Sequence, residues 1–169
     1  LDLHCEPPHG PLADRLDVLV FETEPLDQPI EVTGPVNVSL FVSCDAPDTD
    51  LFAMLLDIYP HTATWPTGYR MNVCDGIMRL RYREGMDKPK LLTPGDIVEV
   101  SFPLYPTSNV FDVGHRIQLM LSGASFPRFD VNPNTGEAIG KNTGKRKATI
   151  TIHHSVDHPS TMVLPVVPT

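Results

Sequence analysis

The sequence has few basic residues, few aromatic residues and no long apolar run. Lys and Arg number 13 against 21 Asp and Glu, which gives a formal net charge of -8 at pH 7. Binding to nucleic acid requires a basic face, so this balance argues against a nucleic-acid partner. No apolar run approaches the roughly 20 residues that a membrane span needs, so we expect no membrane partner.

Cysteine is scarce as well. Cys5, Cys44 and Cys74 form an odd and widely spaced set that contains no C-x-x-C pair. This spacing indicates neither a zinc knuckle nor a redox motif. Reduced thiols are typical of cytoplasmic proteins, and the first 15 residues lack the basic-then-apolar order of a signal peptide. We therefore expect a cytoplasmic protein.

Helical stripes longer than two turns are missing, and period-two alternation takes their place. Eighteen prolines and 11 glycines leave little room for long helices. Alternate apolar residues mark strands with one buried face, and segment 51–59 is apolar on both faces, as in a strand packed on two sides. Clear alternation occurs at 36–43, 98–104, 117–121 and 148–152, and weaker strands are expected at 17–22, 77–83 and 162–167. Such strands at fairly regular spacing predict an all-β sandwich or jelly roll.

Catalytic motifs are absent. Hydrolysis by a serine nucleophile on a strand-to-helix turn would show a G-x-S-x-G elbow, which the sequence does not contain. Ser122 and Ser125 are available, but no helix is expected after them. We expect no catalytic residue and no cofactor in this chain.

Three groups of residues have the chemistry of metal ligands. His4, Cys5, Glu6 and His9 lie close to the N-terminus, and the adjacent His153 and His154 would point to opposite faces of a strand. Asp45, Asp48 and Asp50 share one loop that could hold a structural calcium, although they lack the regular spacing of a calcium loop. Aspartates also cap turns. We expect no metal and leave the calcium alternative open.

Exposed aromatic rings leave a second class of function open. Trp65, Tyr69, Phe126 and Phe129 could stack on sugar rings, and Trp65 lies in a stretch that contains Pro and Gly. With only 7% aromatic residues, most rings are needed for a core or an interface. A stand-alone carbohydrate-binding or interaction module is thus kept as the alternative function and not as the main one.

The segment SGASFPRFDVNPNTG, residues 122–136, concentrates unusual residues. Burial of Phe126 and Phe129 is worth about 3–6 kcal/mol by transfer estimates, so exposing both would be costly. Pro127 stiffens the backbone between them, and Arg128 can form a forked pair with a carboxylate across a contact. Either the loop meets a partner, or both rings cover the domain's own core.

Five segments in one order resemble a known family. They are 15–60, 74–85 (CDGIMRLRYREG), 91–104 (LLTPGDIVEVSFPL), 108–136 and 158–168. The pattern resembles the C-terminal domain of the X-Pro dipeptidyl-peptidase and cocaine-esterase (CocE/NonD) family of serine hydrolases. A departure stands at Val131, where the pattern usually has arginine.

The resemblance implies a jelly-roll β-sandwich similar to galactose-binding domains, with residues 1–14 as an extension from a preceding domain and 15–169 as a single sandwich. It places the Ser, Asp and His of the triad in a preceding α/β-hydrolase domain of the same polypeptide, which would cleave ester or X-Pro peptide bonds. This chain would pack on that domain and help shape its substrate cleft, and a homo-oligomer is a further partner. Phe126, Arg128, Phe129 and Trp65 are the interface candidates.

Overall fold

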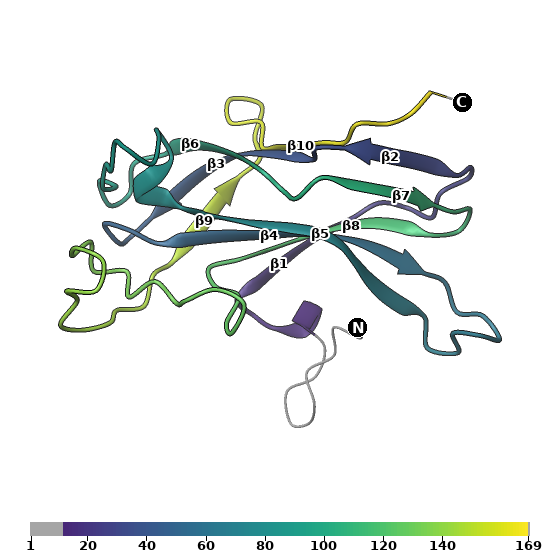
Figure 1. Cartoon of the computed structure of the whole chain (residues 1–169), viewed down its shortest axis with the longest axis horizontal. Helices are drawn as coiled ribbons and strands as arrows, with labels where there is room; N and C mark the ends of the chain where they lie inside the picture. Colours follow the sequence, from purple (N-terminus) through teal and green to yellow (C-terminus); the bar gives the residue numbers. More distant parts are fainter. Residues whose placement is uncertain (1–11, 169) are drawn as a thin grey trace.

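Two layers of antiparallel strands face each other in a computed structural model that describes residues 12–168 (Figure 1). The expected metal-ligand group at His4, Cys5, Glu6 and His9 lies outside the described residues, as does most of the expected 1–14 extension. The strands are β1 (Val18–Glu22), β2 (Ile30–Gly34), β3 (Asn37–Cys44), β4 (Asp50–Tyr59), β5 (Tyr69–Arg79), β6 (Val98–Pro103), β7 (Thr107–Phe111), β8 (Arg116–Ser122), β9 (Ile150–His153) and β10 (Thr161–Val163). Two short 3-10 turns are η1 (Leu12–Asp14) and η2 (Leu80–Tyr82).

One layer is a four-stranded sheet in the order β1-β8-β4-β5. In the second layer β3 pairs with β6 along one edge and with β9 and β10 along the other. The pair β2–β7 continues this layer, and a bridge between Val32 and Val166 links it to the C-terminal segment. The chain passes between the layers repeatedly, and consecutive strands such as β4 and β5 also pair within one sheet. The expected all-β sandwich is confirmed.

The core between the layers comes from the alternation in the sequence. Val36, Val38, Leu40 and Val42 are at most 2% exposed. Their partners across the sandwich include alternate residues of the four-stranded sheet, namely Leu51, Ala53, Leu55, Cys74, Ile117, Leu119 and Leu121. The expected inward faces of 36–43, 98–104 and 117–121 are therefore confirmed.

The opposite side of the four-stranded sheet, which we call its outer face, is also apolar. Phe52, Met54, Leu56 and Met120 are buried there as a second cluster, with Phe129 packed against them. Strand β4 is thus apolar on both sides, as predicted for 51–59. A sheet with two apolar faces needs a cover on each, and η1 and the loop after β8 supply part of the outer one.

Three expectations for the strands were wrong in detail. The segment 77–83 stops pairing at Arg79, because the backbone N–H groups of Leu80 and Arg81 donate to Thr49 O and Asp48 Oδ1 instead of continuing the ladder. Strand β5 starts as early as Tyr69, well before the expected strand at 77–83, and the nine residues 60–68 connect it to β4. Strands β2 and β7 were not predicted.

None of the described helical segments is long and apolar enough to span a membrane.

Gly76 marks a point where the two layers approach closely. A Cβ atom there would lie 2.8 Å from the carbonyl oxygen of Pro103 and 3.1 Å from Cδ2 of Leu104. We expect Gly76→Ala to lower the free energy of unfolding by about 1–3 kcal/mol, because this backbone contact cannot relax cheaply. Urea unfolding measures the effect. Gly144→Ala is the matched control, since a Cβ atom there meets nothing within 4 Å, and an equal loss in both variants would contradict the prediction.

Cys44 and Cys74 are free thiols buried in the core. Burial raises the pKa of both, and that of Cys74 to about 11. The folded chain therefore keeps the Cys74 proton after the unfolded chain has lost it, and this contribution to stability disappears as pH rises from about 9 through 11. We expect the unfolding free energy to fall less steeply over that range in Cys74→Ala than in the wild type. Parallel slopes would contradict the assignment.

Candidate functional site

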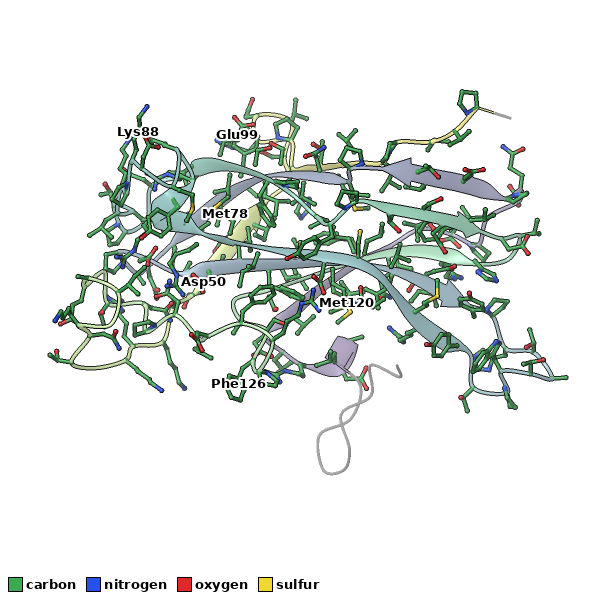
Figure 2. All side chains as sticks on the ribbon, in the orientation of Figure 1. Asp50, Met78, Lys88, Glu99, Met120 and Phe126 are labelled. Carbon is green, nitrogen blue, oxygen red and sulfur yellow. The ribbon has the colours of Figure 1, made fainter. Side chains whose placement is uncertain are left out.

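The loop 123–136 leaves β8 and crosses the outer face of the four-stranded sheet. Its two phenylalanines have different environments. Phe129 packs against Phe52, with ring centroids 6.1 Å apart, while Phe126 is 74% exposed. Figure 2 shows Phe126 beyond the outer face, on the side to which Met120 points. One ring covers the domain's own apolar cluster, and the other is presented to solvent.

Arg128 connects this loop to the edge of the sheet. Its Nη2 donates to Oδ1 of Asp75 over 2.8 Å, and its guanidinium lies 5.5 Å from the ring centre of Phe129 and 6.0 Å from that of Tyr105. Asp75 is 2% exposed, and a buried carboxylate without a partner would be costly. Arg128 supplies that partner. The bond found for Arg128 differs from the expected forked pair across a contact, because it is made by Nη2 to a carboxylate within the domain itself.

A buried group of charges holds the second half of the loop. Arg79 donates from Nε and Nη2 to the two oxygens of Asp50 over 2.8 and 2.9 Å, and this bond raises the pKa of Arg79. Arg81 donates from Nε to Asp48 over 2.8 Å. Asn132 joins the two ion pairs, because its Nδ2 donates to Asp48 over 3.0 Å and to Asp50 over 2.8 Å. We call these five residues the carboxylate network.

Every polar atom of the Asn132 side chain is used. Both hydrogens of its amide nitrogen go to carboxylates, and its Oδ1 accepts from the backbone N–H of Asn134 over 2.9 Å. Asn134 adopts a φ of 62°, a left-handed conformation that asparagine tolerates better than most residues. Its own Nδ2 donates to the carbonyl of Arg146. The NPNTG turn is thus fixed from within the domain.

The loop that was considered for calcium has another role. Asp48 and Asp50 are bound by arginines, and Asp45 accepts from the backbone N–H of Thr149 over 2.8 Å, a bond that lowers the pKa of Asp45. Among residues 12–168, no cluster of three His, Cys, Asp or Glu side chains is arranged to hold a metal ion. The spacing of these aspartates serves arginine pairing and turn formation.

Two depressions flank the loop. One, with a volume of about 380 Å³, is lined by Leu12, Met54, Phe126 and Val131 among others. The other, of about 340 Å³, is lined by Ile77, Tyr105, Pro106 and Phe129 among others. Tyr105 is 60% exposed and Val131 is 49% exposed. Loop and depressions together form an apolar surface, which we call the outer-face surface.

Trp65 is not part of this surface. It lies in the connection between β4 and β5, stacked on Tyr69 at 4.6 Å between ring centroids and in edge contact with Tyr59. Phe129 contacts Phe52 near the other end of β4, and the seven steps along the strand from Phe52 to Tyr59 span about 23 Å. The structure therefore brings together Phe126, Arg128 and Phe129 but leaves Trp65 at the opposite end of the sheet (Figure 1).

Histidine pairs occur at two separate places. His115 Nδ1 lies 2.8 Å from Oδ1 of Asp57, a buried carboxyl whose pKa is raised by burial. His153 Nε2 lies 2.9 Å from the hydroxyl of Ser43. Within the described residues, these hydrogen bonds do not join one serine, one histidine and one carboxylate into a chain, as a triad requires.

Comparison with known proteins gives this architecture a family. The model of the X-Pro dipeptidyl-peptidase C-terminal non-catalytic domain matches residues 5–163. The chain belongs to this family. The resemblance read from the five segments is thereby confirmed, and the chain is a non-catalytic C-terminal domain of the X-Pro dipeptidyl-peptidase and CocE type of hydrolase.

Individual relatives agree. A cocaine esterase from Rhodococcus sp. (strain MB1 Bresler) is 44% identical over 159 residues, which cover 93% of this chain and 27% of the relative. The structure of an alpha-amino acid ester hydrolase aligns with a TM-score of 0.88 and 34% identity. The alignment covers 98% of this chain and 27% of the hydrolase chain. A CocE/NonD family hydrolase from Staphylococcus aureus shares the fold, with a TM-score of 0.70 and 20% identity. The alignment covers 89% of this chain and 30% of the hydrolase chain.

The chain thus spans about a quarter of the cocaine esterase that it matches, 27% of its length. This proportion is consistent with a catalytic domain fused to the sandwich in the same polypeptide.

The carboxylate network yields a test. We expect Asn132→Ala to lower the free energy of unfolding by about 2–3 kcal/mol, because two buried carboxylates lose a donor. Asn142→Ala is the control, since Asn142 is exposed in the same connection between β8 and β9. Urea unfolding followed by circular dichroism measures both. Equal stability of the two variants would show that the network does not hold the loop.

Proposed function

We propose that this chain is the accessory β-sandwich of a serine hydrolase, and that its outer-face surface packs against the catalytic domain and helps to shape the substrate cleft. The reaction of the whole protein is then acyl transfer from an ester or amide to water through a serine acyl-enzyme. The nucleophile, base and carboxylate belong to the catalytic domain, and this chain supplies support and part of a wall.

The observation that carries the proposal is the exposed Phe126 on a loop that is fixed from behind. An apolar ring that is 74% exposed on a fixed loop is unfavourable in a free domain. Its burial against a partner is worth about 1.5–3 kcal/mol. The exposed Val131 and Tyr105 extend the same surface on either side of the loop.

The ordering of the loop also favours a docking role. Arg128 and Asn132 hold it through Asp75, Asp48 and Asp50 before any partner arrives. A preorganised contact avoids the cost of ordering a loop at the moment of association.

The alternative of a stand-alone carbohydrate-binding module has less support. Trp65 uses one ring face to stack on Tyr69, and Phe126 and Phe129 lie at the other end of the sheet. Sugar platforms need several rings exposed together. A fixed apolar surface in a chain that matches a quarter of a longer hydrolase favours docking.

The test compares Phe126→Ser with Val156→Ser. Both wild-type side chains are strongly exposed, Val156 at 97%, but Val156 lies in the connection between β9 and β10 and outside the outer-face surface. In the intact polypeptide that carries the catalytic domain, we expect Phe126→Ser to lower the thermal midpoint or raise KM. Titration of the nucleophile with an organophosphate should still give one serine per chain.

In the isolated 169-residue chain, Phe126→Ser should leave urea unfolding unchanged and reduce the binding of an apolar dye. If Phe126→Ser and Val156→Ser behave alike in the intact polypeptide, the docking role of this loop is wrong.

A further inference from the structure

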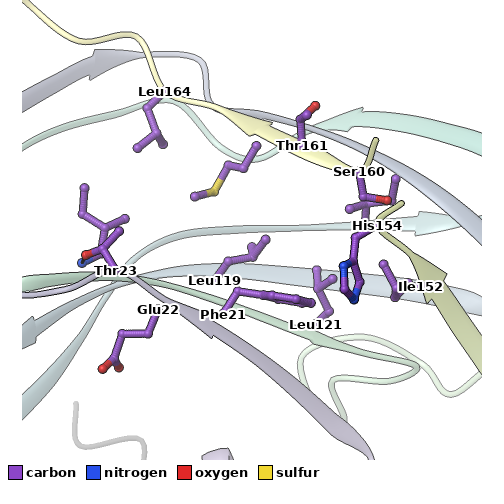
Figure 3. A pocket seen from close by; sticks show the side chains of 13 residues that line it. Phe21, Glu22, Thr23, Leu119, Leu121, Ile152, His154, Ser160, Thr161 and Leu164 are labelled. Atoms are coloured by element: carbon purple, nitrogen blue, oxygen red, sulfur yellow. Dashed lines mark hydrogen bonds between the residues drawn. The ribbon is translucent and has the colours of Figure 1, made fainter. Parts of the chain in front are cut away.

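A third depression, with apolar walls, lies between the two layers, on the side of the sandwich where β1 faces β9 and β10 (Figure 3). Its volume is about 390 Å³. The floor is formed by core residues, including Leu40 and Leu121, which are each 2% exposed. We call it the seam cleft. It opens on the inner side of the four-stranded sheet, and the outer-face surface is on the other side.

The seam cleft exists because one edge of the sandwich is not closed. Phe21 pairs with Leu119 across β1 and β8, and directly opposed residues project from the same side of a sheet. Leu119 belongs to the core, so Phe21 also points inward. Phe21 nevertheless remains 40% exposed, because the second layer does not cover the inner side of β1.

The interior of the cleft is apolar, and its polar groups lie at the rim. Side chains of Ile117, Ile152, Met162 and Leu164 complete the walls. Glu22 follows Phe21 on the strand and so projects to the outer side, where Gln118 donates to it, and Figure 3 shows its carboxylate pointing away. His154 stands at one end in edge contact with Phe21, at 6.2 Å between ring centroids.

The shape of the cleft limits what can occupy it. Stacked sheets lie about 10 Å apart, which leaves one layer of side chains between them. An α-helix with side chains is about 10–12 Å wide and does not enter such a slot. An engineered apolar cavity of about 150 Å³ binds benzene, so the seam cleft has room for about two rings. Its volume also falls within the range of about 300–1,000 Å³ of small-molecule sites.

We propose that the seam cleft is a binding site for an uncharged, flat aromatic small molecule of about two fused rings, with His154 as the polar partner at the rim. The apolar walls exclude a charged group from the interior. The site is independent of docking by the outer-face surface, because the two lie on opposite sides of one sheet.

Indole is a suitable probe because it has two fused rings and one N–H donor. The 169-residue chain is labelled with ¹³C at the methionine methyl groups and titrated with indole. We expect a saturable shift of the Met162 methyl resonance, since Met162 lines the cleft. The resonances of Met86, which is 78% exposed, and of Met120 on the outer face serve as internal references and should stay in place.

Two variants with the same new side chain form the decisive comparison. Leu164→Phe fills the cleft and should weaken indole binding about tenfold or more, while Met162 remains as the reporter. Val163→Phe places the same ring on the preceding residue, which is 60% exposed and is not part of the cleft wall, and should bind as the wild type does. Circular dichroism and thermal unfolding verify both variants, and Ile152→Phe replaces Leu164→Phe if the latter does not fold.

Several outcomes would overturn the proposal. One is the absence of saturation at Met162 up to the solubility of indole, and another is a folded Leu164→Phe that binds as the wild type does. Shifts of Met162 that follow protein concentration without indole would assign the cleft to a second copy of the chain. Phe126→Ser should leave indole binding unchanged, so failure of this proposal and failure of the docking proposal are separately visible.

Discussion

The structure depends on two buried carboxylates at the start of β4. Asp48 and Asp50 are paired with Arg81 and Arg79, and Asn132 donates to both. Removing one partner from a buried pair costs about 3–5 kcal/mol, because the other charge is left without compensation. This constraint explains why β5 leaves the ladder after Arg79 and why the NPNTG turn lies where it does. A loop with few apolar anchors of its own is thereby given one position over the outer face of the sheet.

The same loop divides its aromatic residues between two tasks because of where it is held. Phe129 lies inside the anchored stretch between Arg128 and Asn132 and completes the apolar cluster around Phe52. Phe126 precedes both anchors and stands free of the cluster. The sequence left two interpretations of these rings open. Covering the core applies to Phe129, and contact with a partner is proposed for Phe126.

The sequence predicted the fold well, and the site in part. Period-two alternation identified the buried faces of 36–43, 98–104 and 117–121, and an apolar run on both faces identified β4 as doubly covered. Burial alternates in both β2 and β7, but each has only five residues, and β7 has the polar Thr107 and Asn109 at its half-buried positions, so both strands were missed. The network was missed although a signal existed. Asp48 and Asp50 repeat the two-residue spacing of Arg79 and Arg81, and antiparallel pairing of Asp50 with Arg79 sets the charges opposite each other. The pairing of these two segments is set by the tertiary structure, and residue spacing alone does not predict it.

The four-stranded sheet has two apolar faces and contributes to both candidate binding surfaces, the seam cleft on its inner side and the outer-face surface on the other. Its inner face is closed by the second layer except along β1, and its outer face is closed by η1 and Phe129 except around Phe126. Both openings arise from the same cause, since covering elements that are shorter than the sheet leave part of each face bare. On the outer side Phe126 is exposed beside two depressions, which suits another protein surface. On the inner side it is a slot between sheets, which suits a thin ligand. Because the two bare regions differ in shape, we expect the two faces of the sheet to differ in what they bind.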